Sequence, residues 1–285
     1  MRMRLALFGM VAALLSCAPA HAAFPGENGK IAYTYEELAA NNPGDVHIVN
    51  PDGSGHTSLT PNPLADIDPA WSPDGTKIAY SSRSAPGASM LIWTMNEDGT
   101  AKAAVTTAGS YDDLDPAWTP DGRIGFVRVP RDGSCSLIHV VKPDGSDLTS
   151  LPQGPECRQT SPAFSPDGTK LAYFGYDDTL ETHGLYVADA SNGGATEIVE
   201  DGTAPNWSPG GPWLAYSWNG LFRTTPDGLN RHLIKSLYSE PAWSPDGSRI
   251  AYAGSRTVND AGGDEQELYW HASGRTREPD WQPRP

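Results

Sequence analysis

The strongest constraint on the fold is a segment that recurs along nearly the whole chain. Its clearest copy runs from Asp68 to Tyr80 and reads DPAWSPDGTKIAY. Further copies occupy residues 115–126, 161–173, 204–216 and 240–252, a partial copy at 24–33 begins at its aromatic residue, and another at 278–281 ends there. A chain built from one repeated unit buries the hydrophobic face of each unit against its neighbours.

One aromatic residue marks every copy of the repeat. These residues are Phe24, Trp71, Trp118, Phe164, Trp207, Trp243 and Trp281, and their spacings are 47, 47, 46, 43, 36 and 38 residues. A period of about 40 to 45 residues with short β-like segments is typical of propeller blades. The 30 Gly and 26 Pro among 285 residues interrupt every stretch, which argues against helical bundles and coiled coils.

Each repeat divides into four predicted strands, which we label a to d. Strand a contains Pro-Ala-Trp, and the Ser-Pro-Asp-Gly that follows is a tight turn in which Pro fixes φ and Gly accepts a positive φ. Strand b contains Ile-Ala-Tyr, strand c is apolar or alternating, and strand d is short. The N-terminal partial copy supplies strands b to d of one blade, and the C-terminal copy supplies strand a of the same blade.

We therefore predict an all-β chain, a six-bladed β-propeller of four-stranded antiparallel blades over residues 24–285. The C-terminal strand pairs into the N-terminal blade and closes the ring, so that no long strand edge is left exposed.

The motif Pro-x-Trp-Ser-Pro-Asp-Gly-x-x-Ile-Ala-Tyr resembles the repeat of TolB-like, WD40-like (PD40-type) β-propellers. It is matched around Trp71, Trp118, Phe164 and Trp243, and the resemblance extends from Phe24 to Trp281. The resemblance implies a fold rather than an activity, because propellers host many unrelated functions. The family's type member also has an N-terminal α/β domain, whereas here the predicted signal segment leads straight into the first blade, so the resemblance is to the propeller alone.

Residues 1–23 predict a secretory signal peptide. Arg2 and Arg4 form a basic start, residues 5–16 are apolar, and Ala20-His21-Ala22 offers a cleavage site with small residues. An alternative is a lipobox at residues 14–17, in which Cys17 would be lipidated, but Leu15 is an uncommon residue at its position in such boxes. Both interpretations predict an exported protein, secreted or periplasmic. No later apolar stretch is long enough to cross a bilayer.

The formal net charge of −15 argues against a nucleic-acid-binding surface. Acidic residues gather where the chain enters strand a, the innermost strand of each blade, and we predict that they ring the channel mouth on the face of the long b–c and d–a loops. These residues are Asp66, Asp68, Asp112, Asp113, Asp115, Glu240 and Glu278. Basic residues follow the a–b turns, so we expect them on the opposite face.

Converging carboxylates focus a negative potential. Such a ring suits a basic peptide segment or a hard cation such as Ca²⁺, for which Asp68 and Asp115 are candidate ligands. The alternative for each single acid is a turn-flanking residue that only accepts backbone hydrogen bonds.

Cys135 and Cys157 remain after removal of the signal segment. The predicted topology places both on the loop face of one blade, one strand apart, and an oxidising compartment favours a disulfide between them. Closing a loop of this length contributes about 3 kcal/mol and would staple a long loop. The alternative is two free thiols.

The sequence shows no catalytic constellation. None of the six His residues beyond the signal segment falls on strand a, metal-type spacing is absent, and no Gly-x-Ser-x-Gly elbow occurs. We therefore predict a monomeric, non-catalytic binding module for a protein or peptide partner on the loop face. The alternative is a carbohydrate-active or lyase-type propeller that uses loop-face carboxylates as acid and base. An evenly spread ring of acids favours binding, and a pair with one raised pKa favours catalysis.

Overall fold

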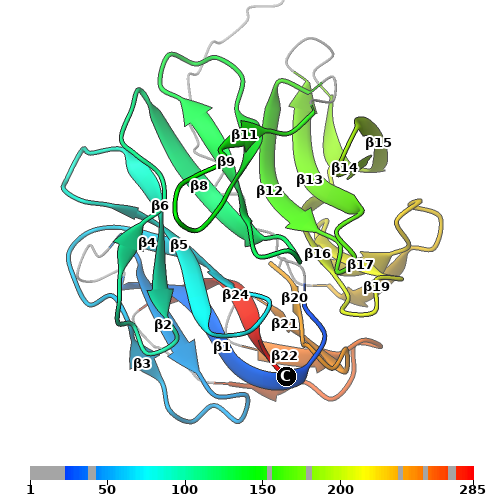
Figure 1. Ribbon diagram of the computed structural model, residues 1–285. Helices are drawn as coiled ribbons and strands as arrows, with labels where there is room; N and C mark the ends of the chain where they lie inside the picture. The colour runs from blue at the N-terminus through cyan, green and yellow to red at the C-terminus, as the bar shows by residue number, and fades with distance from the viewer. Residues whose placement is uncertain are drawn as a thin grey trace, which may run out of the picture.

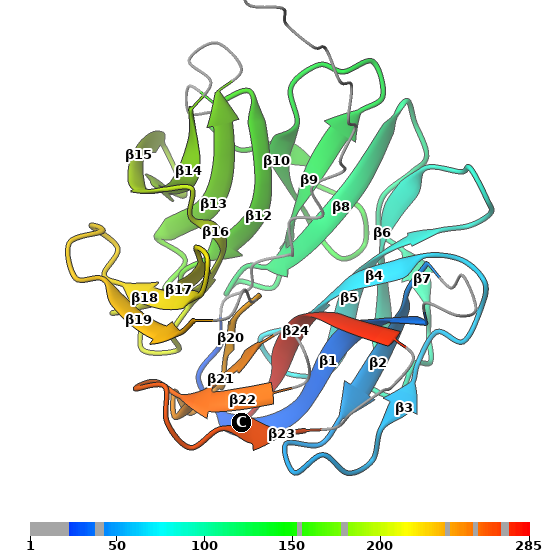
Figure 2. The ribbon, with the colours of Figure 1, turned by 180° about the vertical axis from the view of Figure 1, so that it is seen from behind.

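The computed structural model describes residues 23–37, 43–152, 156–177, 182–236, 240–252, 256–268 and 274–285. Within these ranges the strands form six four-stranded sheets, and every paired strand within a sheet is antiparallel. The six sheets surround a central axis as the blades of a propeller (Figure 1, and from behind in Figure 2). The predicted fold is confirmed. The predicted signal peptide lies outside the described residues, apart from Ala23.

The blades are numbered I to VI along the ring, with strands a to d in order from the axis outward. Blade I contains β24 (Gly274–Arg284), β1 (Glu27–Glu37), β2 (Asp45–Val49) and β3 (Thr57–Ser58), and blade II contains β4 (Asp66–Trp71), β5 (Lys77–Arg83), β6 (Met90–Asn96) and β7 (Ala103–Ala104). Blade III contains β8 (Tyr111–Trp118), β9 (Ile124–Pro130), β10 (Leu137–Val141) and β11 (Thr149–Ser150), and blade IV contains β12 (Arg158–Phe164), β13 (Lys170–Asp177), β14 (Thr182–Asp189) and β15 (Gly193–Glu200). Blade V contains β16 (Thr203–Trp207), β17 (Leu214–Ser217), β18 (Leu221–Thr224) and β19 (His232–Lys235), and blade VI contains β20 (Ala242–Trp243), β21 (Arg249–Tyr252), β22 (Arg256–Asn259) and β23 (Gln266–Glu267).

Both ends of the chain build blade I, as predicted. β24 pairs with β1 antiparallel, with Ile31 opposite Trp281 and Glu27 opposite Arg284. The C-terminal strand therefore supplies the inner strand that the N-terminal segment lacks, and the ring closes through a sheet rather than through a loop.

The repeat positions build the core between neighbouring blades. The aromatic residue of strand a and the tyrosine of strand b supply most of the largest fully buried side chains, among them Trp71, Trp207, Trp281, Tyr80, Tyr173, Tyr216 and Tyr252. Blade III has Gly125 where other blades have the alanine of Ile-Ala-Tyr. A Cβ at Gly125 would lie 2.4 Å from Cε2 of Phe164, so the next blade packs against the bare backbone here.

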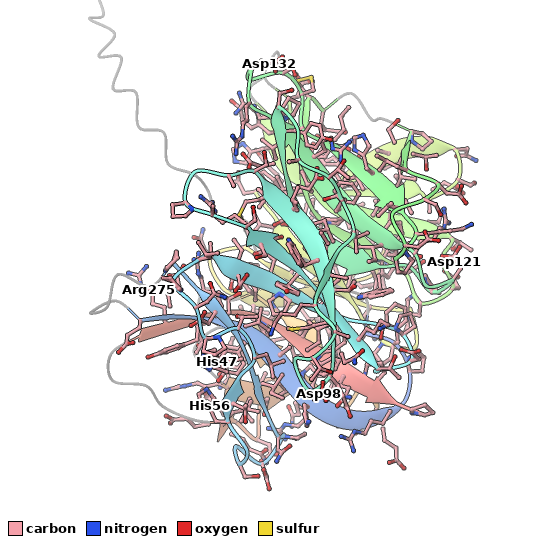
Figure 3. All side chains as sticks on the ribbon, turned by 60° about the vertical axis from the view of Figure 1, so that its left-hand side comes forward. His47, His56, Asp98, Asp121, Asp132 and Arg275 are labelled. Atoms are coloured by element: carbon pink, nitrogen blue, oxygen red, sulfur yellow. A yellow bond between two sulfur atoms is a disulfide. The ribbon has the colours of Figure 1, made fainter. Side chains whose placement is uncertain are left out.

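The aspartates of the tight turns are held by the turns themselves. In the a–b turn of blade II, Asp74 Oδ1 accepts hydrogen bonds from the backbone N–H and the hydroxyl of Thr76. Asp98 repeats this pattern with Thr100 in the c–d turn. Figure 3 labels Asp98 together with Asp121, which is the equivalent of Asp74 in the a–b turn of blade III. Exposed acids therefore share the turn face with the predicted basic residues, and the expected separation of charge between the two faces is incomplete.

The predicted disulfide is present. Cys135 and Cys157 are bonded with their Cα atoms 4.7 Å apart. Cys135 precedes β10 of blade III, and Cys157 directly precedes β12 of blade IV, beside a parallel bridge between Ser136 and Arg158. The disulfide therefore joins two blades, whereas the topology predicted from the sequence had it stapling a loop.

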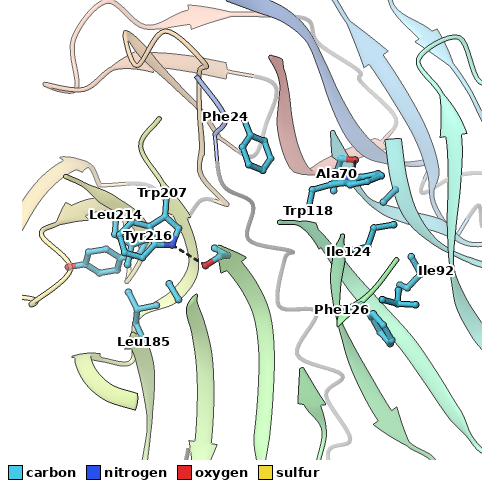
Figure 4. Packing of buried hydrophobic residues seen from close by; sticks show 14 of the residues in the cluster. Phe24, Ala70, Ile92, Trp118, Ile124, Phe126, Leu185, Trp207, Leu214 and Tyr216 are labelled. Atoms are coloured by element: carbon cyan, nitrogen blue, oxygen red, sulfur yellow. Dashed lines mark hydrogen bonds between the residues drawn. The ribbon is translucent and has the colours of Figure 1, made fainter. Parts of the chain in front are cut away.

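Phe24 precedes β1, and Trp281 takes the repeat position in strand a of blade I, as the two partial copies of the repeat predict. The Phe24 side chain is 6% exposed and packs in the central core cluster that contains Trp118 and Trp207 (Figure 4). The backbone N–H of Ala23 donates to the Trp207 carbonyl at 3.2 Å. The start of the described chain is therefore held among the inner strands.

We expect Phe24→Ala to lower the free energy of unfolding by about 3–5 kcal/mol, because truncating a buried phenylalanine leaves a cavity in the core. Chemical denaturation measures the effect. Leu229→Ala is the control, since Leu229 is 80% exposed and its loss should change stability by less than about 0.5 kcal/mol. Equal, small effects of both substitutions would contradict the central packing of Phe24.

Candidate functional site

The residue three positions before the aromatic of strand a is acidic in some blades and neutral in others. In blade order from VI to V this position is occupied by Glu240, Glu278, Asp68, Asp115, Ser161 and Ala204. The acids therefore occupy four adjacent blades, and small neutral residues occupy the other two. We call Glu240, Glu278, Asp68 and Asp115 the acid arc. Of the seven acids predicted to bind a ligand, the structure brings these four together.

The backbone at this position is in the left-handed region in five blades, at Glu278, Asp68, Asp115, Ser161 and Ala204, with φ between 50° and 59°. This conformation costs a non-glycine residue about 1–2 kcal/mol. In these blades the register between strands a and b also shifts next to this position, as a β-bulge produces. Ser161 and Ala204 have the same left-handed backbone, so the bulge is a feature of the repeat and not of the acids. The acid arc differs from these two positions only in its side chains.

Carboxylates of the arc join neighbouring blades. Glu240 Oε2 accepts the backbone N–H of Glu278 at 2.9 Å, and Glu278 Oε2 accepts that of Asp68 at 3.1 Å. Asp115 Oδ2 accepts the N–H of Ser161 at 3.1 Å. These three carboxylates each bind the inner strand of the next blade, so part of their role is structural, as the alternative interpretation from the sequence proposed.

Burial and nearby negative charge raise the pKa values of Glu240, Asp115 and Asp68. Burial is the main cause of the raised pKa of Glu240, to about 8, and the charge of Glu278 adds to it. Burial likewise raises the pKa of Asp115 to about 7, with a further contribution from Glu278. The pKa of Asp68 is well above its usual range because of burial and the charges of Glu278 and Asp115. The hydrogen bonds between Glu240 and the backbone of Glu278, and between Glu278 and that of Asp68, link the acidic residues of three neighbouring blades.

The arc has no cationic neighbour among the residues that the structure describes. None of the ion pairs formed there includes an arc carboxylate. The same ranges hold no group of three or more His, Cys, Asp or Glu side chains placed to hold a metal ion. Ca²⁺ binding at Asp68 and Asp115 therefore stays a prediction, and its remaining ligands would be water or the partner's own oxygen atoms.

The other three predicted acids lie apart from the arc and are paired. Asp113 receives two hydrogen bonds from the Arg128 guanidinium, at 2.8 and 2.9 Å, with its own side chain fully buried. Asp112 pairs with Arg131 at 2.8 Å, and Asp66 accepts from the Asn62 amide at 2.5 Å. The β-bulge explains why these acids lie apart from the arc. It shifts the alternation of side chains along strand a, so residues before the bulge do not share a face with residues after it. Asp113 stabilises blade III, whereas Asp112 also accepts the backbone N–H of Met90 at 2.8 Å and so joins blades II and III.

Sequence reasoning missed Asp280 and Asn206. Asp280 Oδ2 accepts the backbone N–H of Trp71 at 2.6 Å, and Asn206 Oδ1 accepts that of Trp243 at 2.8 Å. Burial raises the pKa of Asp280 well above its usual range. The sequence does distinguish these two residues, because each replaces the alanine of the Pro-Ala-Trp motif with a polar side chain.

A second concave region lies on the turn face between blades III and IV. Its volume is about 600 Å³, and Val140, Leu151 and Phe164 contribute apolar surface to it. Its acids Asp121, Asp167 and Asp189 accept hydrogen bonds within their own turns. The groove therefore offers less uncompensated charge than the arc.

Comparison with known proteins identifies a family whose model spans the whole propeller. The family model described as "TolB beta propeller domain" matches residues 21–283. The chain is similar to "Protein TolB homolog" of Chlorobium luteolum, with 31% identity over 125 residues, which are 41% of this chain and 28% of the relative. The match thus spans less than a third of that relative's length.

Two solved structures place the fold among known propellers. TolB from Acinetobacter baumannii superposes with a TM-score of 0.78 at 20% identity, over 92% of this chain and 68% of that one. An oligogalacturonate lyase in complex with manganese superposes with a TM-score of 0.53 at 14% identity, over 85% and 74%. Identities this low establish the shared fold alone.

The raised pKa values predict the effect of pH on stability. A glutamate in the unfolded chain titrates near pH 4.3, whereas Glu240 in the folded chain titrates near 8. Between these values the folded state binds more protons, so the contribution of Glu240 to stability is complete below about pH 4 and is lost as the pH rises toward 8. Glu240→Gln keeps an oxygen acceptor for the N–H of Glu278 but does not titrate.

Relative to wild type, Glu240→Gln should therefore gain stability from pH 5 to pH 8, by at most about 1.4 kcal/mol per pH unit. Denaturation curves at several pH values measure this difference. Asp98→Asn, at an exposed turn, is the control and should follow wild type across this window. A Glu240→Gln curve parallel to that of wild type would show that Glu240 titrates normally.

Proposed function

The chain belongs to the TolB β-propeller family, and we propose that it is a non-catalytic binding module that receives a positively charged segment of a protein or peptide partner. The observation that carries this proposal is the acid arc, which places one carboxylate in each of four adjacent blades, on or just before the inner strand, and none of these carboxylates forms an ion pair within the described part of the chain. A lysine or arginine side chain would supply the missing charge.

The electrostatics of the arc favour a cationic ligand over an anionic or neutral one. Buried carboxylates with raised pKa values hold protons near neutral pH, and an entering cation displaces them by lowering those pKa values. The exchange replaces protons with hydrogen bonds between charged groups, which are about twice as strong as neutral ones. Binding should therefore release protons and strengthen between pH 6 and pH 8.

Export is part of the proposal. Disulfides persist in oxidising compartments, and Cys135 is bonded to Cys157. This agrees with the signal peptide predicted for residues 1–23, whose cleavage, or lipidation at Cys17, would leave the propeller secreted or periplasmic. No helix among the described residues is long and apolar enough to cross a membrane.

An oligoarginine peptide tests the arc directly. We expect Asp115→Asn combined with Glu240→Gln to weaken its binding more than tenfold, because removing one partner of a desolvated charge pair costs about 2–5 kcal/mol. Calorimetry in buffers of different ionisation enthalpy measures both the affinity and the protons released.

The matched control removes the same number of charges from the turn face. Asp98→Asn combined with Asp144→Asn retains both turns, since asparagine accepts the same hydrogen bonds. This variant should bind within about twofold of wild type, after correction for screened long-range attraction. Equal losses in the two double variants would mean that the peptide responds only to net charge, and the acid arc would then be rejected as the site. Cross-linking from the native cell surface or medium would identify the natural partner.

Ca²⁺ is the second occupant that the arc suits. If it binds at Asp68 and Asp115, millimolar Ca²⁺ should raise the melting temperature of wild type, because a ligand that binds only the folded state stabilises it. The same Ca²⁺ should leave the variant with Asp68→Asn and Asp115→Asn unchanged. An unchanged melting temperature of wild type would count against a cation at the arc.

The raised pKa of Asp115, about 7, also supports the alternative of an enzyme, because a general acid works best with a pKa near the working pH. The arc makes an acidic sugar a poor substrate, because none of its carboxyl groups can supply a positive charge to the uronate groups of an oligogalacturonate, and those that ionise would repel them. A neutral glycan is the substrate class that remains for a catalytic function.

A further inference from the structure

A pair of histidines lies at the outer strands of blade I, far from the strand a positions of the acid arc. His47 is on β2 and is 7% exposed, and His56 precedes β3 and is exposed to solvent. His47 Nδ1 and His56 Nε2 are 2.9 Å apart, and their rings stack with centroids separated by 4.8 Å. Figure 3 labels the two residues side by side.

We propose that His47 and His56 form a bidentate site for a divalent transition metal, with Cu²⁺ as the preferred ion. Imidazole nitrogen is a ligand that suits Cu²⁺, Ni²⁺ and Zn²⁺, and the affinity of such a site is highest for Cu²⁺. Neither the family resemblance nor the acid arc requires this pair.

The separation of the nitrogens fits two adjacent ligands on one ion. With metal–nitrogen bonds of about 2.0–2.1 Å, neighbouring ligands lie about 2.8–3.0 Å apart in a square-planar complex and about 3.3 Å apart in a tetrahedral one. The observed 2.9 Å matches the square-planar arrangement that Cu²⁺ and Ni²⁺ prefer. Water completes the coordination on the exposed side of His56.

A metal ion can replace the hydrogen bond between the two histidines without a further reactant. In the pair, one neutral imidazole donates its N–H to the lone pair of the other. On metal binding, the donating ring moves its proton to its other nitrogen, and both facing nitrogens then present lone pairs to the ion. No electron is transferred, and no proton is lost overall.

Comparison of blades I and III shows that His47 has an equivalent in the repeat, whereas His56 does not. His47 lies opposite Tyr33 of β1, and at the same repeat position His139 lies opposite Phe126 in blade III. A histidine stacked on a strand b aromatic is therefore also compatible with a purely structural role. His56 has no such counterpart, because Leu148 occupies the equivalent place two residues before the partner of His139.

Copper titration of the metal-free, full exported chain tests the site. We expect one Cu²⁺ per chain with nitrogen hyperfine splitting from two imidazoles in the electron paramagnetic resonance spectrum. His56→Asn should weaken this binding by more than the roughly tenfold that loss of an outer-shell partner costs, and should reduce the splitting to that of one imidazole. Because His56 is exposed, this substitution leaves the fold intact, which circular dichroism verifies.

His139→Asn is the matched control, since it removes a histidine from the same repeat position in another blade. It should retain wild-type affinity and the wild-type spectrum. Equal affinity and identical spectra for wild type and His56→Asn would overturn the proposal, and so would a wild-type spectrum without imidazole nitrogen. Ca²⁺ should not compete with Cu²⁺ here, because Ca²⁺ selects oxygen ligands, so this result is separate from any result at the acid arc.

Discussion

The structure depends on the seams between neighbouring inner strands, where a closed ring of blades must be joined. Each of the six seams carries at least one hydrogen bond across it. Glu240, Glu278, Asp280, Asp115 and Asn206 accept backbone N–H groups of the next blade, and the indoles of Trp118 and Trp207 donate to the carbonyls of Ala70 and Ala163 in the preceding blade. The disulfide reinforces one seam, between blades III and IV. Removing any single bond would leave a buried polar group unpaired, which costs about 1–3 kcal/mol.

The seams connect stability to the candidate site, because three arc carboxylates serve both. A backbone N–H satisfies part of the hydrogen-bonding capacity of each carboxylate, yet it supplies no full positive charge. The carboxylate is therefore held rigidly in place while its ionisation remains unfavourable, which is what the raised pKa values of Glu240 and Asp115 report. A cation at the axis would stabilise the ring and be bound by groups that need no rearrangement. Preorganisation of this kind lowers the entropic cost of ordering the binding groups.

The sequence predicts the fold well because the repeat encodes it locally. The tight turns, the aromatic of strand a and the Ile-Ala-Tyr of strand b each act within one blade, and the incomplete terminal copies determine the closure. All four residues of the acid arc were predicted, but Asp66, Asp112 and Asp113 were grouped with them. A β-bulge at Asp68 and its equivalents changes which residues share a face, and left-handed φ at a residue before proline gives no clear signal in sequence. Long-range pairs were not predictable either, since Asp113 finds Arg128 on the neighbouring strand, and Phe24 packs with residues of distant blades.

Departures from the repeat carry more functional information than the repeat itself. A feature that recurs in every blade, such as the buried aromatic residue of strand a, meets a packing requirement that every blade shares. An acid at Asp115 and a serine at Ser161 occupy the same left-handed position, so the backbone cannot be the reason for the difference. His56 and Leu148 likewise share one place in two blades. In a ring whose blades are otherwise interchangeable, such differences break the symmetry, and a ligand that must bind in one orientation requires a broken symmetry.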